Sequence, residues 1–478
     1  MSSLVYLKSK NGDTVYVYVN EKGEDGRYHR RCIGHLDPIT GEVLENKKKE
    51  HRTEAKVRSY GVNLLLGRIS DSIGLTESLQ VVFKDSWDSV LSFAFYCLTE
   101  GSLLTDMGRW MEFNETPRMW PLTPDEIKDI LRDITQESID SFFRVWNKMC
   151  GNTGYMLTAL SIGRPANKVA RADYDGLFST EIEVCYGIGT GIPVAYHIQP
   201  TPYRTVHDMV SSATWDDWMD NDRTSYLIER EQAGEFGWEQ ILNIDNQYIV
   251  SFSKDDPMFR KMLNQYCRDR VLNSSQVKTF RYNFRGKRVF LHTFFNPMDA
   301  ELETSRFLLA MDRCRMELES KNYEVSHAPF YNKYFITTDR NKIEMNSEAI
   351  MRHNQAAGYQ IVMSNSFDDP AETMRWMRRN DYCRKMFNSV RNPDELTAMK
   401  LFVETNMRSR MFIQFLATIL GSKLTDMISR SGLNETVDSV LLQMKELIRV
   451  NIDSRRKPIM AEPNEHQRSI LDMLLTSV

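Results

Sequence analysis

Closely spaced carboxylates are the residues of this chain that could hold a divalent cation. Asp173 and Asp175 lie two residues apart in RADYDGLF, and Glu181 and Glu183 lie two apart on the apolar segment that follows. Mg²⁺ requires oxygen ligands of this kind. The first pair falls in an expected loop, where acidic residues are usually solvated, and the second pair points to one face of an expected strand. Asp381, in an expected helix, is a further candidate ligand.

Sulfur and imidazole ligands show no metal-binding spacing. The chain has seven cysteines and nine histidines, scattered along its length, with no CxxC pair and no HExxH. An odd number of dispersed cysteines is typical of reduced thiols in a cytosol. We therefore predict no zinc site, no histidine-based metal site and no cofactor.

Basic residues are concentrated toward the C-terminus. Residues 374–460 carry 16 Lys and Arg against 9 Asp and Glu, a net charge of +7, so the rest of the chain carries −11. Charge segregation of this kind indicates an anionic partner, most often nucleic acid. A solvated basic helical surface is the alternative interpretation.

Composition indicates a globular protein of several domains. The 478 residues are 41% hydrophobic and 26% charged, which are ordinary values for a soluble chain long enough to bury a large core. The longest apolar run, near Phe412–Leu420, is short against the roughly 20 residues that cross a bilayer. The N-terminal MSSLVYLKSK has no apolar core of a signal peptide. We expect a cytoplasmic protein without a membrane span, associated with the nucleoid if it binds DNA.

The expected secondary structure changes along the chain, from strands to helices and then to a mixture of both. Residues 4–45 alternate as strands with turns, and residues 59–150 have helical apolar spacing, with LTPDEIKDILRDI and ITQESIDSFFRVW opening as helices do. Short apolar strands and a helix-like GWEQILN between 154 and 252 predict an α/β sheet. A strand-rich piece with FRYNFRGKRVF, which interleaves aromatic and basic residues, precedes a long helix and further helices.

Four stretches, in order, resemble the DDE transposases of bacterial insertion sequences, in the branch whose RNase H-like core carries a β insertion and a YREK helix. They are RRCIGHLDPITGEV, EIEVCYGIGTGIPVAYHI, RVFLHTFFNP, and GYQIVMSN followed by a paired-basic helix and LFVETNMRSRMFIQFLATIL. The resemblance covers roughly residues 10–420. It implies three carboxylates, two Asp and one Glu, that hold two Mg²⁺ ions for cleavage and transfer of DNA strands.

The three ligand positions depart from that pattern. Met156 stands where the resemblance implies the first Asp, Glu229 stands where it implies the second, and Arg384 stands where it implies the Glu of the helix. The other signature positions of that helix are Met377, Asn380 and Arg391. We predict an inactive metal site, and an ion pair between Arg384 and Glu229 in its place.

DNA binding is the function that such a chain would keep without metal ions. Clustered cations are expected to contact phosphates. The predicted DNA-binding residues are Lys47, Lys48, Lys49, Arg52, Arg378, Arg379, Lys385, Arg391, Arg408, Arg410, Arg455, Arg456 and Lys457.

The predicted fold class is α+β and multidomain, with an RNase H-like α/β core interrupted by a β-rich insertion. The expected domains are an N-terminal β arm (1–50), a helical DNA-binding region (51–150), the first half of the core (151–254), the β-rich insertion with a helix (255–335), the second half of the core (336–400) and a C-terminal helical region (401–478).

The predicted function is that of a domesticated, transposase-derived protein that binds double-stranded DNA without cleaving it, as a regulator or scaffold. An active transposase with atypical or relocated carboxylate ligands and Mg²⁺ is the alternative, and a protein-interaction role without DNA binding is a third. The resemblance implies a homodimer. We expect no small-molecule substrate.

Overall fold

The computed structural model describes most of the chain. The described residues are 3–10, 12, 14–22, 27–45, 55–101, 104–162, 180–199, 208–209, 223–229, 237–266, 275–337, 343–389, 405–433, 435–452 and 457–475. They divide into two units, Met1–Lys56 with Val450–Ile459, and Val57–Arg449 with Met460–Val478.

The first unit contains a four-stranded antiparallel sheet in the order β1-β2-β3-β4. Its strands are β1 (Ser3–Lys8), β2 (Val15–Lys22), β3 (Tyr28–Leu36) and β4 (Val43–Glu45). The predicted hairpin at DPITGE is confirmed: Asp37 Oδ1 accepts the backbone N–H of Ile39 at 2.8 Å, and Gly41 adopts a φ of +70°. An aspartate that bonds the backbone two residues on and a glycine at positive φ are ordinary turn chemistry.

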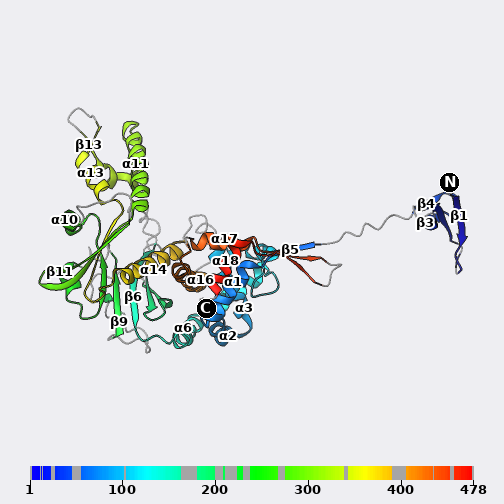
Figure 1. The fold of residues 1–478 in the computed structure, drawn as a ribbon, viewed down its shortest axis with the longest axis horizontal. Coiled ribbons are helices and arrows are strands. Elements are labelled where there is room, and N and C mark those ends of the chain that lie inside the picture. Colours follow the sequence, from blue (N-terminus) through cyan, green and yellow to red (C-terminus); the bar gives the residue numbers. More distant parts are fainter. Residues whose placement is uncertain are drawn as a thin grey trace. The chain divides into compact units, whose positions relative to one another are not determined.

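The second unit contains an eight-stranded mixed sheet (Figure 1). Its order is β11-β12-β15-β10-β9-β6-β7-β8. The strands are β6 (Tyr155–Ile162), β7 (Thr180–Gly187), β8 (Pro193–Gln199), β9 (Thr224–Ile228), β10 (Tyr248–Ser251), β11 (Gln276–Phe284), β12 (Lys287–Phe295) and β15 (Tyr359–Ser364). β6 and β10 both run parallel to β9, and the other neighbours are antiparallel.

The pairing of strands in this sheet differs from the expected division into domains. The strands β11 and β12 were expected in a separate insertion, 255–335, but β12 pairs with β15 from Phe290↔Ser364 to Phe295↔Tyr359 and so extends the same sheet. The buried pattern of β12 explains the difference, because Val289 and Leu291–Phe295 are all buried. A strand that is buried on both faces needs neighbours above and below it, as a central strand has.

A small module of helices and two short strands spans the end of the expected insertion and the start of the expected second half of the core. Its elements are α11 (Pro297–Glu319), η5 (Val325–His327), α12 (Ala328–Tyr334), β13 (Phe335–Thr337), β14 (Ile343–Met345) and α13 (Ser347–Ala356). The module has a core of its own, made of Phe307, Met311, Cys314, Tyr334 and Phe335. The helices α9 (Trp238–Leu242), α10 (Pro257–Tyr266) and α14 (Pro370–Ser389) accompany the sheet.

The remaining helices form one helical body, drawn from both ends of the chain. They are α1 (Gly61–Ser72), α2 (Leu75–Phe83), η1 (Lys84–Ser86), α3 (Trp87–Thr99), η2 (Leu104–Asp106), α4 (Met107–Phe113), α5 (Pro124–Asp133), α6 (Gln136–Cys150), α16 (Thr405–Ser431), α17 (Val437–Lys445) and α18 (Glu465–Leu475). The predicted starts of α5 and α6 are confirmed, with Thr123 and Thr135 as N-caps and a capping box between Thr123 and Glu126.

Regions 51–150 and 401–478 were expected to be separate, but they pack together. Phe412 of α16 meets the rings of Phe83 and Phe142 at centroid distances of 5.5 and 5.2 Å, and Phe415 meets Phe143 at 5.4 Å. Region 401–478 is also not wholly helical, because β16 (Ile448–Ile452) and β17 (Ile459–Met460) form a sheet with β5 (Ala55–Ser59).

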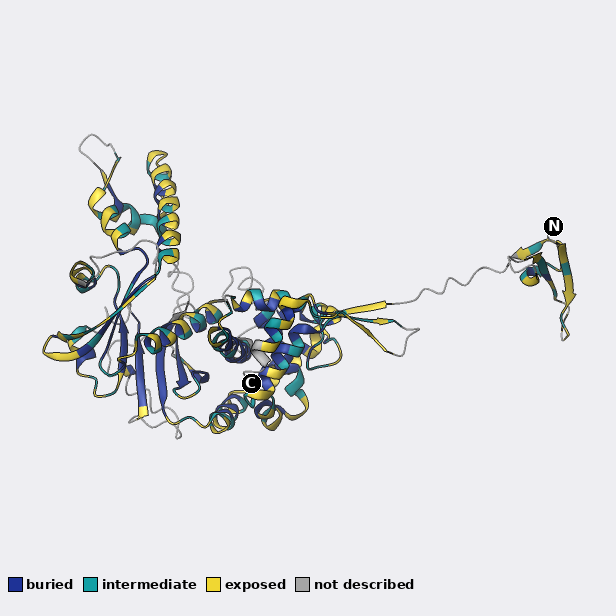
Figure 2. Ribbon diagram, viewed as in Figure 1, coloured by how far each residue is buried: buried dark blue, intermediate teal, exposed yellow. Residues whose placement is uncertain are grey.

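Among the described residues, one helix is long and apolar enough to cross a membrane, Arg408–Ser431 of α16. In its most apolar window 83% of the residues are buried inside the protein, and Figure 2 shows this helix largely in the buried colour. The apolar character of α16 is therefore accounted for by its position in the core.

Candidate functional site

The three predicted site residues lie on three elements of the second unit, and the structure brings two of them together. Glu229 directly follows β9, Arg384 is on α14, and Met156 is on β6. Met156 pairs with Ser225, four residues before Glu229, which corresponds to roughly 13 Å along the strand. The structure therefore separates Met156 from the other two residues.

Glu229 and Arg384 form the predicted ion pair. Glu229 Oε1 accepts hydrogen bonds from the Arg384 guanidinium and from Asn380 Nδ2. Asp381 Oδ1 lies 3.6 Å from the same guanidinium. The Glu229 side chain is 10% exposed and that of Arg384 is 31% exposed, so the pair is open to solvent on the arginine side only.

Burial has the largest effect on the pKa of Glu229. It raises the pKa of this carboxyl to about 7, while the positive charge of Arg384 acts in the opposite direction. Among the described residues, Asn380 Oδ1 and Arg384 Nε are buried without a hydrogen-bond partner. The pair is therefore mostly enclosed by the protein, with solvent access on the arginine side.

Carboxylates for a three-ligand metal site are not supplied by the described residues around Glu229. The strand β6, YMLTALSI, contains no Asp or Glu in any register. Glu183 is fully buried on β7, but it pairs with Ala159, whereas Met156 and its partner Tyr186 point to the face that α14 covers. Successive residues alternate between faces, so Glu183 points away from Arg384. The guanidinium of Arg384 also brings a positive charge to the position where the resemblance implied metal ions, and these residues do not fit Mg²⁺.

The other relocated candidates can be placed only in part. Asp381 lies beside Arg384, as described above. Asp173 and Asp175 lie outside the described residues, as does the side chain of Glu181.

Arg379 is engaged inside the protein, although its sequence neighbours predicted a contact with DNA. Its guanidinium lies 3.2 Å from Asp426 Oδ1 and 4.9 Å from the centre of the Trp376 ring, and its side chain is 14% exposed. It also packs on Gly191, where a Cβ would come within 2.2 Å of the guanidinium carbon. This position suits an internal cation better than a phosphate ligand.

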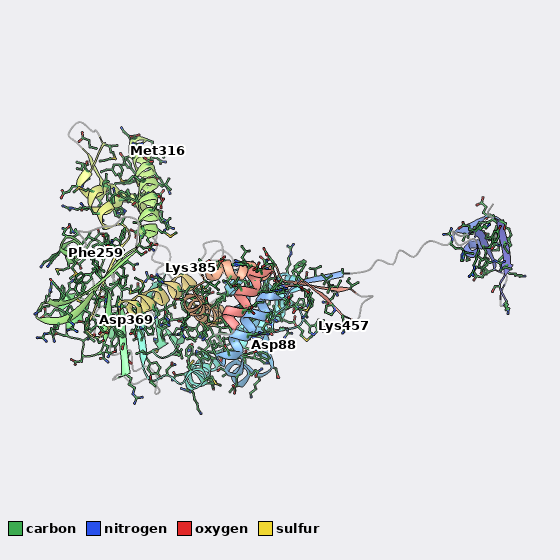
Figure 3. All side chains as sticks on the ribbon, in the orientation of Figure 1. Asp88, Phe259, Met316, Asp369, Lys385 and Lys457 are labelled. Atoms are coloured by element: carbon green, nitrogen blue, oxygen red, sulfur yellow. The ribbon has the colours of Figure 1, made fainter. Side chains whose placement is uncertain are left out.

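The remaining predicted DNA-binding residues are distributed as follows. Arg378, Lys385, Arg408 and Lys457 are exposed, and Arg410 is half-buried. Lys385, labelled with Lys457 in Figure 3, forms an exposed ion pair with Asp438 at 3.0 Å. Outside the described residues lie Lys47, Lys48, Lys49, Arg52, Arg391, Arg455 and Arg456.

The β11–β12 hairpin carries cations that the predicted list omits. Residues 276–295 contain five cations and no Asp or Glu. We call these five cations the ribbon cations. All but the half-buried Lys278 are exposed, and within the described chain none of them forms an ion pair. The ribbon cations are Lys278, Arg281, Arg285, Lys287 and Arg288.

The turn of this hairpin presents its cations at the tip. Arg285 and Gly286 connect the strands with φ values of +49° and +86°, as a two-residue type I′ turn requires. Arginine is an uncommon residue at positive φ, and its guanidinium lies 5.8 Å from the ring of Phe284. The interleaved aromatic and basic pattern of FRYNFRGKRVF was the signal for these cations.

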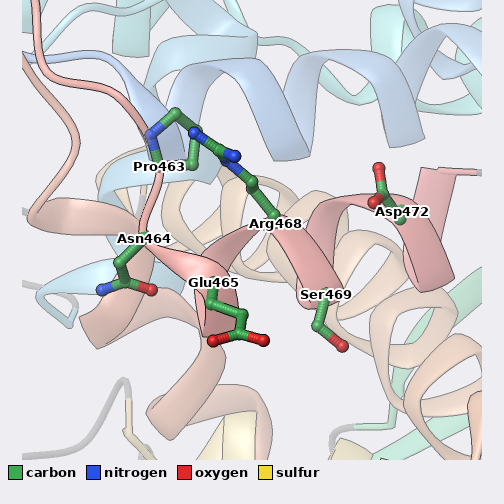
Figure 4. Close-up of a pocket in the computed structure, with 6 residues that line it drawn as sticks. All are labelled: Pro463, Asn464, Glu465, Arg468, Ser469 and Asp472. Atoms are coloured by element: carbon green, nitrogen blue, oxygen red, sulfur yellow. The ribbon is translucent and has the colours of Figure 1, made fainter.

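A shallow hollow beside α18 brings together polar side chains without a catalytic arrangement (Figure 4). It is lined by Pro463, Asn464, Glu465, Arg468, Ser469 and Asp472. Arg468 is paired with Glu462 at 3.3 Å. We assign no chemistry to this hollow.

Comparison with known proteins gives a distant structural likeness. No protein-family model and no curated protein matches the sequence. Among solved structures, the chain is similar to piggyBac transposase in a synaptic complex with hairpin DNA, with a TM-score of 0.27 and 9% identity over 87% of this chain and 77% of that chain. At this TM-score the likeness supports no assignment, so a functional proposal has to rest on the chain's own residues.

Proposed function

We propose that this chain is a transposase-derived protein that binds double-stranded DNA and does not cleave it. The observation that carries the proposal is the β11–β12 hairpin with its ribbon cations. Beyond the pairing of Phe290 with Ser364 the hairpin is two-stranded, a shape that fits the major groove of DNA, and Lys and Arg side chains without an ion-pair partner neutralise phosphates.

The order of the central strands supports an RNase H-like core. β6, β7 and β8 form an antiparallel meander, and β9 and β10 add on the other side of β6 as parallel strands. This arrangement agrees with the resemblance of the sequence to DDE transposases.

The buried Glu229–Arg384 pair supports the loss of metal-dependent cleavage. A transposase of this kind needs a carboxylate where Arg384 stands and another on β6, which contains no Asp or Glu. The proposal also includes a homodimer, on the basis of the resemblance alone, and a cytoplasmic, nucleoid-associated location, for which the dispersed cysteines of the sequence are the support. The active transposase with relocated ligands is the competing proposal.

Titration of labelled duplex DNA, followed by fluorescence anisotropy over a range of salt concentrations, tests DNA binding. The triple variant Arg281→Ala/Arg285→Ala/Arg288→Ala is expected to bind at least about tenfold more weakly and to show a salt slope smaller by about 2 to 3, because each phosphate contact releases about one counterion.

Arg315→Ala is the matched control, since Arg315 is half-exposed on α11 and pairs with Asp312 and Glu319. It is expected to leave the affinity unchanged. An equal affinity of the triple variant and the control would contradict the proposal. The ribbon cations would then serve to protect the exposed edge strand β11 from pairing with other chains.

A further inference from the structure

Three side chains of different ligand type converge at the end of the long helix α11. Cys314 and Glu317 lie one helical turn apart on α11, and His327 lies on η5, eight residues beyond the end of the helix. The sulfur, a carboxylate oxygen and an imidazole nitrogen all lie within 4.8 Å of one another. Cys314 is buried, while Glu317 and His327 are half-buried.

A sharp reversal of the chain makes this convergence possible. Lys321 adopts a φ of +57°, and the backbone N–H groups of Asn322 and Lys321 donate to the carbonyls of Glu317 and Leu318 at 3.0 and 3.3 Å. These two bonds are those of a Schellman motif, which ends a helix and turns the chain back along it. The motif returns His327 to the face of α11 that carries Glu317.

The polar contacts already orient the two half-buried groups. His327 Nδ1 lies 2.7 Å from Glu317 Oε2, and the Tyr331 hydroxyl donates to the same oxygen at 2.5 Å. Arg313 Nε donates to the other carboxylate oxygen at 3.0 Å. Tetrahedral ligands at about 2.0–2.3 Å from zinc lie roughly 3.3–3.7 Å apart, so His327 and Glu317 need to separate by less than about 1 Å to admit the ion.

We propose that Cys314, Glu317 and His327 bind a structural Zn²⁺ ion, with water as the fourth ligand. Thiolate and imidazole select zinc over Mg²⁺ or Ca²⁺, and a carboxylate completes many such sites. Tyr331 and Arg313 hold the carboxylate, as the groups around metal ligands commonly do. The proposal is independent of DNA binding.

The small core of the module is a physical reason for a bound ion to stabilise it. Among the described residues, its separate core consists of five buried residues, one of which is Cys314 itself, with six partly buried residues packed against them. Cores of this size rarely suffice alone, and a bound metal stabilises small modules by tying helix to loop. The competing explanation is that Cys314 is simply an apolar member of the core and that the Glu317 hydrogen bonds close the module unaided.

This proposal revises the expectation of no zinc site, which rested on spacing. The ligands are arranged as C-x₂-E-x₉-H, without the CxxC or HExxH pattern that marks many zinc sites. Only the reversal at Lys321 brings the histidine to the helix.

Metal content and a cobalt spectrum of the full-length protein test the proposal. Protein dialysed against Zn²⁺ and then against metal-free buffer is expected to retain one equivalent. Replacement by Co²⁺ is expected to produce a thiolate-to-cobalt charge-transfer band, which identifies a cysteine ligand.

His327→Gln and Cys314→Val are each expected to abolish zinc retention, and Cys150→Ser, a half-buried cysteine on α6, is expected to leave it unchanged. If Cys314→Val fails to fold, His327→Gln decides, because His327 is half-buried and outside the module's core. Zinc at the level of the buffer blank in the unmodified chain, or full retention in His327→Gln, would overturn the proposal.

Discussion

Arg384 contributes to the electrostatics at the end of β9, because its guanidinium contacts the buried carboxyl of Glu229. Removing one partner of a buried ion pair leaves the other without compensation, and the cost exceeds any net contribution of the pair itself. Asn380 donates to the same oxygen but carries no charge, so it cannot replace the arginine.

Arg384→Met is therefore expected to lower the free energy of unfolding by about 2 kcal/mol, less than the 3–5 kcal/mol of a fully buried pair because Arg384 is partly exposed. The loss of positive charge also raises the pKa of Glu229 further above its unfolded value. A raised carboxyl pKa gives stability that is present at low pH and is lost as the pH rises, so the deficit is expected to be larger at pH 8 than at pH 5. Urea unfolding at the two pH values measures both effects.

The double variant Glu229→Gln/Arg384→Met is the control for this prediction. It removes the buried charge together with its partner, and is expected to recover most of the stability and to lose the added pH dependence. A single variant as stable as the unmodified chain at both pH values would show that the pair contributes nothing to the packing of α14 on the sheet.

At the scale of elements, two positive-φ residues determine where cationic and metal-ligating side chains lie. Arg285 occupies such a conformation in the β11–β12 turn and Lys321 at the end of α11. Glycine adopts this conformation without steric cost, whereas other residues lose roughly 1 kcal/mol or more. The backbone of Lys321, at the C′ position of α11, is therefore locally strained, and the surrounding contacts hold it in this conformation.

Lys321→Gly is expected to raise the free energy of unfolding by about 0.5–1 kcal/mol, because it relieves this strain without moving the Schellman bonds. Chemical denaturation monitored by circular dichroism measures the change. Lys321→Ala keeps the Cβ and is expected to stay within about 0.5 kcal/mol of the unmodified chain. Equal stabilisation by both substitutions would mean that the lysine side chain, rather than its backbone, is unfavourable there.

At the scale of the whole second unit, α16 joins the helical body to the sheet. Phe415 meets Phe143 of α6 and Tyr196 of β8, at centroid distances of 5.4 and 5.1 Å. α14 packs between this body and the sheet, with Tyr382 against Gly421 of α16 and Arg384 against Glu229. The residues of the proposed degenerate site are thus held by contacts from three distant parts of the chain.

Incubation of the protein with duplex DNA and either Mg²⁺ or Mn²⁺ is expected to produce no strand cleavage, because β6 carries no carboxylate and Arg384 repels the cations. Gel analysis of end-labelled duplexes measures the outcome. Metal-dependent cleavage that Arg384→Met leaves unchanged, but that Asp381→Asn removes, would establish the competing proposal of relocated ligands.

Features that depend on residues close together in the chain could be predicted from the sequence. The turn at DPITGE, the N-caps Thr123 and Thr135, and the mixed α/β character of residues 154–252 depend on residues a few positions apart. The ion pair of Glu229 and Arg384 was also predicted, but only because the resemblance supplied an alignment. The register between strands could not be predicted from the sequence. The resemblance assigned Met156 and Glu229 to one site, whereas the pairing of β6 with β9 places Met156 opposite Ser225.

The sequence by itself determined the composition, the local turns and caps, and the lack of a carboxylate on β6, since these depend only on which residues stand next to one another. The tertiary structure decided that Arg379 is enclosed with Asp426, that the β11–β12 hairpin extends the central sheet, and that His327 returns to Cys314. The physical reason is that burial, register and side-chain convergence arise from contacts between residues far apart in the chain. Their free energies depend on the packed surroundings and not on the local sequence.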